Sequence, residues 1–86
     1  MRDVQFDNHA FEEMREWAVE NPKMLQRIFR IIEETQRTPF NGIGKPEPLK
    51  GDLKGHWSRR INDEDRLVYR VTEDFIIVRS MKEHYR

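Results

Sequence analysis

The sequence contains no cysteine, which excludes disulfide bonds, a thiol nucleophile and zinc-finger ligand sets. It has no apolar run near the roughly 20 residues that a membrane-spanning helix needs, and no apolar segment follows the N-terminal methionine as in a secretory signal. The three histidines lie at no metal-ligand spacing, and dinucleotide-binding and phosphate-loop glycine motifs are absent. We therefore expect a cytoplasmic protein with no membrane contact, no metal and no cofactor.

Charged residues are about as frequent in this sequence as hydrophobic ones. Charged residues make up 37% of the 86 residues and hydrophobic residues 36%, while nine aromatic side chains supply bulky core material. The length suits one domain, 1–86. The formal net charge is +0, but residues 1–36 hold 5 basic and 8 acidic side chains, whereas residues 37–86 hold 11 basic and 8 acidic ones. We expect any polyanion to bind the second half.

Hydrophobic spacing predicts the order of helices and strands. The patterns predict a strand over 1–6, helices over 10–18 and 22–36, and strands over 56–61, 66–72 and 75–81. Asn21 can cap the second helix at Pro22, and Asp7 or Asn8 can cap the first. Residues 38–55, which hold all four glycines, indicate a structured loop. The predicted fold class is α+β, in the order β-α-α-β-β-β, with an antiparallel sheet and both helices packed on one of its faces.

The hairpin formed by the two strands after this loop has a predictable register. A bulge that places Ile61 opposite Leu67 gathers the apolar residues on one face, whereas placing Ile61 opposite Arg66 mixes apolar with basic residues. We therefore predict the bulged register, in which Arg59 lies on the apolar face and must extend its side chain outward to water. The other face is then basic and carries Arg60, Arg66 and Arg70.

Glu47 is a candidate general base. It lies between Pro46 and Pro48, which restrict the backbone on both sides of it. A carboxylate on so stiff a segment is preorganised to accept a proton. A rigid surface connector with a solvated glutamate fits these residues as well, so the segment alone leaves both interpretations open.

His84 and the basic face supply the other parts of one reaction. The imidazole of His84 can donate a proton near neutral pH, although a histidine close to a chain end is also an ordinary exposed side chain. Arg60 and Arg66 can bind phosphate oxygens, or can pair with the acidic turn between their strands. Together with Glu47, these groups suffice for RNA cleavage by attack of a 2′-hydroxyl on the adjacent phosphorus. The base takes the hydroxyl proton, the acid protonates the leaving 5′-oxygen, and the cations stabilise the transition state.

Four segments of the chain form a set that is specific in order and spacing. They are RTPFNGIGKPEPLK over 37–50, WSRRI over 57–61, RLVY over 66–69 and the pair His84-Tyr85. Through this set the sequence resembles the YoeB (Txe) toxins of the RelE superfamily over nearly its whole length, while the two helices match only in pattern.

The resemblance implies a compact RelE-type microbial-ribonuclease fold and a bacterial type II toxin that cleaves mRNA in the ribosomal A site. It implies a YefM-like antitoxin and, as in many members, a toxin homodimer. By position it makes Glu47 the base, His84 the acid and Arg66 the stabiliser of the transition state, with Tyr85 orienting the substrate or the acid. The residues expected to hold phosphate are Lys50, Arg60 and, from the predicted basic face, Arg70.

Two other classes of function remain open at this point. One is a catalytically inactive RelE-fold binding module that acts through an antitoxin partner, and the other is a small structural domain. The resemblance finds its full set of six site residues here, and this favours the enzyme over an inactive relative. The six are Glu47, Lys50, Arg60, Arg66, His84 and Tyr85. We expect an antitoxin to use a disordered acidic segment that becomes ordered on the basic half of the chain.

Overall fold

The computed structural model describes residues 1–83 and has the expected order of helices and strands. Its elements are β1 (Asp3–Phe6), α1 (Asn8–Glu20), α2 (Pro22–Arg37), β2 (Glu47–Pro48), the short 3₁₀ helix η1 (Gly51–Leu53), β3 (His56–Arg60), β4 (Arg66–Val71) and β5 (Phe75–Glu83). The strand β2 was not predicted, because two residues are too few to show an alternating pattern. No helix within residues 1–83 is both long and apolar enough to cross a membrane.

The five strands form one sheet in the order β1-β5-β4-β3-β2. The last three strands form the expected antiparallel meander, and β2 pairs antiparallel with β3. β1 instead pairs in parallel with β5, with Asp3 opposite Phe75, so the sheet is mixed and not wholly antiparallel. Parallel pairing requires a long connection between the two strands, and here it contains both helices and the strands β2, β3 and β4. The α+β class is confirmed with this refinement of the sheet.

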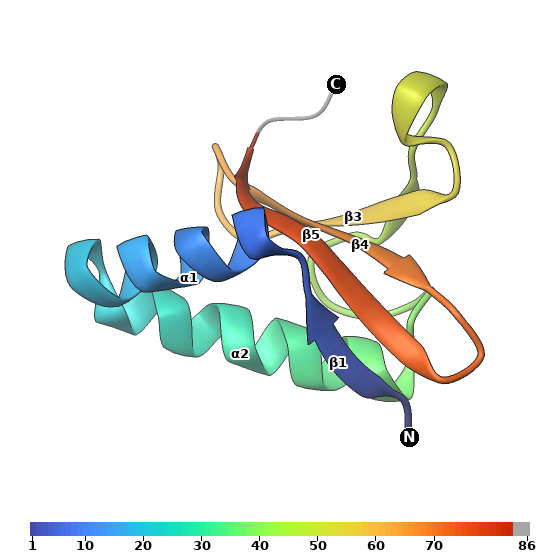
Figure 1. Ribbon diagram of the computed structural model, residues 1–86, viewed down its shortest axis with the longest axis horizontal. Helices are drawn as coiled ribbons and strands as arrows, with labels where there is room; N and C mark the ends of the chain where they lie inside the picture. The colour runs from blue at the N-terminus through green and yellow to red at the C-terminus, as the bar shows by residue number, and fades with distance from the viewer. Residues whose placement is uncertain (84–86) are drawn as a thin grey trace.

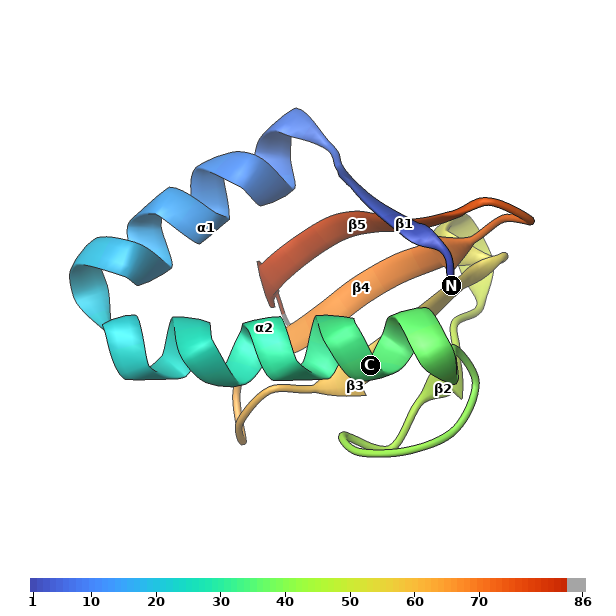
Figure 2. The same cartoon turned by 90° about the horizontal axis from the view of Figure 1, so that it is seen from below.

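Both helices lie on one face of the sheet, as predicted (Figures 1 and 2). The Asn21 side chain accepts a hydrogen bond of 3.1 Å from the Met24 backbone N–H, with Pro22 at the first turn, so the predicted cap of α2 is confirmed. Asp7 occupies the N-cap position of α1, but its side chain makes no capping hydrogen bond. The backbone N–H of Asp7 donates instead to the Val78 carbonyl, which ties the start of α1 to β5.

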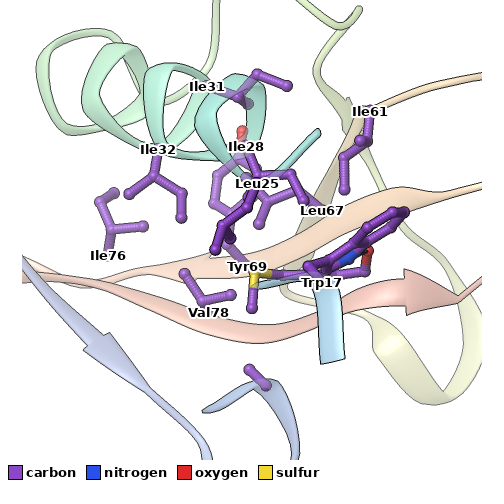
Figure 3. Packing of buried hydrophobic residues seen from close by; sticks show 12 residues of the cluster. Trp17, Leu25, Ile28, Ile31, Ile32, Ile61, Leu67, Tyr69, Ile76 and Val78 are labelled. Atoms are coloured by element: carbon purple, nitrogen blue, oxygen red, sulfur yellow. Dashed lines mark hydrogen bonds between the residues drawn. The ribbon is translucent and has the colours of Figure 1, made fainter. Parts of the chain in front are cut away.

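The core lies between the helices and the sheet (Figure 3). Trp17 from α1 belongs to it, and Ile28 and Ile31 from α2 are completely buried. The strands contribute, among others, Leu67, Tyr69, Ile76 and Val78, all completely buried. Large side chains from every layer therefore compensate for the low hydrophobic content, since each fully buried one contributes about 1.5–3 kcal/mol.

The predicted register of the hairpin is wrong, although its faces are right. Arg59 pairs with Leu67 and Arg60 with Arg66, which shifts the pairing by two residues from the predicted one. A shift of two residues leaves every side chain on the same face, because strand side chains alternate with period two. The irregularities lie between β4 and β5 instead, around Val68.

The turn between β3 and β4 explains this register. The side chain of Asn62 accepts hydrogen bonds from the backbone N–H groups of Glu64, at 2.8 Å, and of Asp65, at 2.6 Å. The Ile61 N–H donates to the Asp65 carbonyl at 3.0 Å. An asparagine side chain that replaces backbone turn bonds in this way closes the hairpin early, and the strands then pair without the predicted bulge.

Candidate active site

A small hollow of about 130 Å³ brings together three of the predicted site residues. Glu47, Arg60 and Arg66 line it, and Gly44, Lys45 and Ser58 complete the wall. Arg60 and Arg66 are neighbours of core residues along their strands, so they point to the opposite face, away from the helices. The predicted basic face is confirmed, and the hollow lies at its β2 edge.

Backbone pairing at the sheet edge positions Glu47. Glu47 lies opposite Ser58, and the Leu49 N–H donates to the His56 carbonyl at 2.9 Å. The prolines on both sides of Glu47 fit an edge strand, since they cannot donate hydrogen bonds to a further strand. Glu47 itself is exposed. The carboxylate is therefore fixed through its backbone while it remains open to solvent.

A close backbone contact holds the segment before Glu47 against β3. The Arg60 N–H donates to the Gly44 carbonyl at 2.6 Å. A Cβ at position 44 would lie 2.8 Å from the Arg60 carbonyl oxygen, and the φ of Gly44 is +78°, so only glycine fits without strain. The next residue, Lys45, has a φ of 50°, a conformation that costs a non-glycine residue about 1–2 kcal/mol. The strained Lys45 lines the hollow.

Arg59 fixes the loop between α2 and β2, and its predicted outward orientation is wrong. The side chain is fully buried, and its guanidinium donates to the carbonyls of Thr38, Asn41 and Ile43 at 2.5, 2.7 and 3.1 Å. It also forms an ion pair with Glu34 at 3.6 Å. The prediction failed because the loop turns three carbonyls inward, and these match the donors of one guanidinium better than water does.

Like charges face each other across the hairpin at the hollow. Arg60 pairs directly with Arg66, an arrangement that destabilises a sheet when no anion compensates it. The guanidinium of Arg66 is half-buried and donates to the carbonyls of Asn62 and Asp65 at 3.0 and 3.1 Å. The turn thus orients Arg66, while Arg60 is exposed.

The remaining predicted residues do not line the hollow. Lys50 is exposed at the start of η1, and Arg70 lies four residues from Arg66 on the same face of β4, opposite His56. His84 and Tyr85 lie outside the described residues. The described chain ends at Glu83, whose backbone pairs with Arg66.

Helix α1 holds the end of β5 in place. Trp17 donates from its ring nitrogen to the Met81 carbonyl at 3.1 Å, and Glu13 accepts from the Met81 N–H at 2.6 Å. Lys82 forms ion pairs with Glu16 and Glu20 at 3.0 and 2.8 Å. These bonds, chiefly the one to Glu20, raise the pKa of Lys82. The strand that leads to His84 is therefore fixed at Met81 and Lys82, close to the last described residue.

Three residues of the hollow were not predicted as site residues, namely Gly44, Lys45 and Ser58. Lys45 was considered only as part of the proline-rich segment, because its left-handed backbone cannot be inferred from sequence. Ser58 could have been found, since it lies two residues before Arg60 and a strand places residues two apart on one face. No group of three or more potential metal ligands occurs within residues 1–83.

A wider depression of about 760 Å³ lies at the other end of the sheet. Its wall includes the N-terminal residue Met1 with Arg2 and Arg37, but also three carboxylates, Asp3, Glu73 and Asp74. This balance of charges gives it no net attraction for a polyanion. The smaller hollow therefore remains the candidate active site.

His56 gives a prediction for the pH dependence of stability. Burial is the main cause that lowers the pKa of His56 below 6.5, and the charges of Arg79 and Arg70 lower it further, against a backbone hydrogen bond at Leu53 and the charge of Asp7. The unfolded chain then binds more protons, so stability falls as the pH drops below about 6.5. Melting temperatures from about pH 7.5 to about pH 5.5 should fall less in His56→Gln than in the parent. An equal fall in melting temperature in both proteins would show that His56 does not cause this pH dependence.

Comparisons with known proteins all find the same family of toxins. The chain matches the YoeB-like toxin of bacterial type II toxin-antitoxin system over residues 6–85. It is 52% identical to Toxin YoeB of Mycobacterium bovis over 85 residues, which are 99% of this chain and 100% of that protein. The YoeB dimer from Staphylococcus aureus superimposes with a TM-score of 0.91 at 40% identity, covering 98% of both chains. A YoeB-YefM complex from the same species gives 0.89 at 41% identity, over 99% of both chains.

These matches extend over the fold and the hollow alike, since residues 6–85 include every strand and helix from α1 onward. They confirm the expected RelE-type fold. The chain therefore belongs to the YoeB family of toxins of bacterial type II toxin-antitoxin systems.

Proposed function

We propose that this toxin is an endoribonuclease that cleaves mRNA in the ribosomal A site and thereby inhibits translation. One observation carries the proposal: Glu47, Arg60 and Arg66 come from three different strands and meet in one hollow. A carboxylate beside two converging guanidinium groups suits a reaction in which a proton leaves and negative charge builds up on phosphate oxygens.

Each residue has a distinct role in the proposed reaction. Glu47 accepts the proton of the 2′-hydroxyl, whose oxygen then attacks the adjacent phosphorus. Arg66, oriented by the turn carbonyls, stabilises the added charge of the pentacovalent phosphate, and Arg60 holds a phosphate oxygen. His84, next in sequence after Glu83, protonates the leaving 5′-oxygen, and Tyr85 orients the substrate or the acid. The pairing of Glu83 with Arg66 supports this assignment, because the described chain ends beside the hollow.

The ribosome completes this site in our proposal. Glu47 is exposed and the hollow is small, so water screens its charges in the free protein. Bound mRNA and ribosomal surface would exclude that water and strengthen every electrostatic interaction. Cleavage of a translated mRNA should therefore be much faster than cleavage of the same RNA free in solution. Equal rates on both would contradict a role for the ribosome.

The proposed partners follow from the charges and from the relatives. A YoeB from S. aureus forms a complex with YefM, and a YoeB from the same species forms a dimer. We infer a YefM-like antitoxin for this toxin, with an acidic segment that becomes ordered on the basic half of the chain, and a homodimer in its free form. The site of action is the cytoplasm, where translated mRNA is found.

Replacing Glu47 by glutamine tests the enzyme directly. Glu47→Gln keeps the shape of the side chain but removes the base, and general acid–base catalysis contributes typically 10²–10⁴-fold. We expect induction of the parent chain to arrest growth and to create new mRNA 5′ ends, mapped by primer extension. The variant should produce at least about 10²-fold fewer cleaved ends.

The matched control is Glu33→Gln, the same change at an exposed position of α2. It should cleave like the parent, because it lies outside the hollow. If Glu47→Gln arrests growth as strongly as the parent, and neither produces new 5′ ends, the protein is a binding module and the enzyme proposal is wrong.

A further inference from the structure

A second group of cations lies on the basic face, away from the hollow. Arg70 is opposite His56 in the hairpin, and both share a face with Arg60 and Arg66. Arg79 lies in the irregular part of β5, between Val78 and Ser80. It is exposed, whereas the residues of β5 that face the helices are completely buried. We call His56, Arg70 and Arg79 the distal cluster.

The distal cluster has an excess of positive charge. Arg70 and Arg79 are both exposed, and neither forms an ion pair within residues 1–83. Arg70 pairs with His56 across the hairpin, and its partner on β5 is Ile77, two residues before Arg79. Both guanidinium charges lower the pKa of the His56 imidazole. Asp7 is a carboxylate that acts on the same ring from the start of α1, so two guanidinium groups face one carboxylate. This imbalance is typical of a surface that binds an anion.

The distal cluster and the hollow lie along one line. The pair Arg60–Arg66 and the pair His56–Arg70 are separated by a single pair, Ser58 and Val68, which carries no charge and is buried. Four residues of strand separate Arg66 from Arg70, a distance of about 13 Å at roughly 3.3 Å per residue. This is longer than the spacing between adjacent phosphates of one strand, so a bound RNA would contact the two groups with phosphates that are not neighbours.

We propose that Arg70 and Arg79, beside His56, form a second phosphate-binding subsite, which holds the RNA backbone a few nucleotides from the cleaved bond. The inference rests on the proposed function and adds a second contact point to it. RNA is favoured over an acidic peptide because the two cation groups follow one strand at a spacing that suits a chain of regularly spaced phosphates.

The test compares short and long RNA that cannot be cleaved because its 2′-hydroxyls are methylated. An oligonucleotide of about ten nucleotides reaches both groups, whereas a dinucleotide reaches only the hollow. In the double variant Arg70→Gln/Arg79→Gln, the dependence of log Kd on log salt for the long RNA should fall by about 1.4, since each lost contact to single-stranded nucleic acid removes about 0.7. Binding of the dinucleotide should not change.

The matched control is Arg15→Gln/Arg30→Gln, which removes two exposed arginines from the helices. It should leave the salt dependence for the long RNA as in the parent. An unchanged salt dependence in the distal variant overturns the subsite. The subsite is also overturned if that variant weakens the binding of a polyglutamate peptide but not of RNA, because the cluster would then bind a protein partner. Loss of long-RNA binding in a chain that cleaves no mRNA would support the subsite and contradict the nuclease proposal, so the two remain separable.

Discussion

Replacing Arg59 by methionine should destabilise the protein by about 3–5 kcal/mol, the usual result of removing one partner from a buried ionic and hydrogen-bonded group. The variant keeps most of the side-chain volume but removes the guanidinium that donates to the carbonyls of Thr38, Asn41 and Ile43. It also leaves Glu34 without its cation. Small domains have total stabilities of about 5–15 kcal/mol, so the variant should be close to unfolding. Urea unfolding followed by circular dichroism measures the change.

The neighbouring substitution Arg60→Met is the matched control for this prediction. Arg60 is exposed, and its side chain makes no hydrogen bond or ion pair within the described chain, so its loss should change stability by less than about 0.5 kcal/mol. Arg59→Lys should fall between the two, because an ammonium cannot reach three separate carbonyls at once. If Arg59→Met unfolds at the same urea concentration as the parent, the three carbonyls do not depend on this side chain.

Replacing Arg66 should slow catalysis strongly with little effect on folding. We expect Arg66→Ala to lower the rate of RNA cleavage by about 10²–10³-fold, as loss of one transition-state donor does in other enzymes. Arg66→Lys should recover only part of the rate, because it keeps the charge but not the two-pronged geometry. Single-turnover cleavage of a defined mRNA measures both variants.

Arg27→Lys is the control for Arg66→Lys. Arg27 also donates to a backbone carbonyl, that of Ile61 at 2.8 Å, but it belongs to α2 on the other side of the sheet. Both changes replace a guanidinium that donates to the backbone, to two carbonyls at Arg66 and to one at Arg27, and only the change at Arg66 should slow cleavage. Equal rates for Arg66→Ala and the parent would remove Arg66 from the proposed mechanism.

The alternating pattern predicts which face each hairpin residue occupies, but it cannot choose among registers that differ by two. The faces were predicted correctly, since Leu67 and Tyr69 are in the core and Arg60 and Arg66 lie opposite to them. The register depends on how Asn62 closes the turn, a local choice that the hydrophobic pattern does not contain. The parallel pairing of β1 with β5 is likewise a tertiary choice, because a short alternating strand does not specify its neighbour.

For the candidate site, residue chemistry predicted Glu47, Arg60 and Arg66, and the sheet brings all three together. Sequence could not predict Lys45 as part of the hollow, because its place there depends on an unusual backbone conformation. The error at Arg59 has the same origin. The sequence does not show where the loop carbonyls lie, so an outward orientation of the side chain was the only one it could predict. The roles of His84 and Tyr85 stay predictions, since both lie outside the described residues.

The pairing of β1 with β5 has a kinetic consequence. It joins Asp3 to Phe75 across more than seventy residues of chain, and β5 is also the strand that α1 holds at its far end. Contacts between such distant segments form late and slow the search for the native state. Before the ribosome has synthesised β5, β1 has no partner strand and α1 cannot bind the end of β5. We therefore expect the toxin to acquire its native form only after the synthesis of that strand.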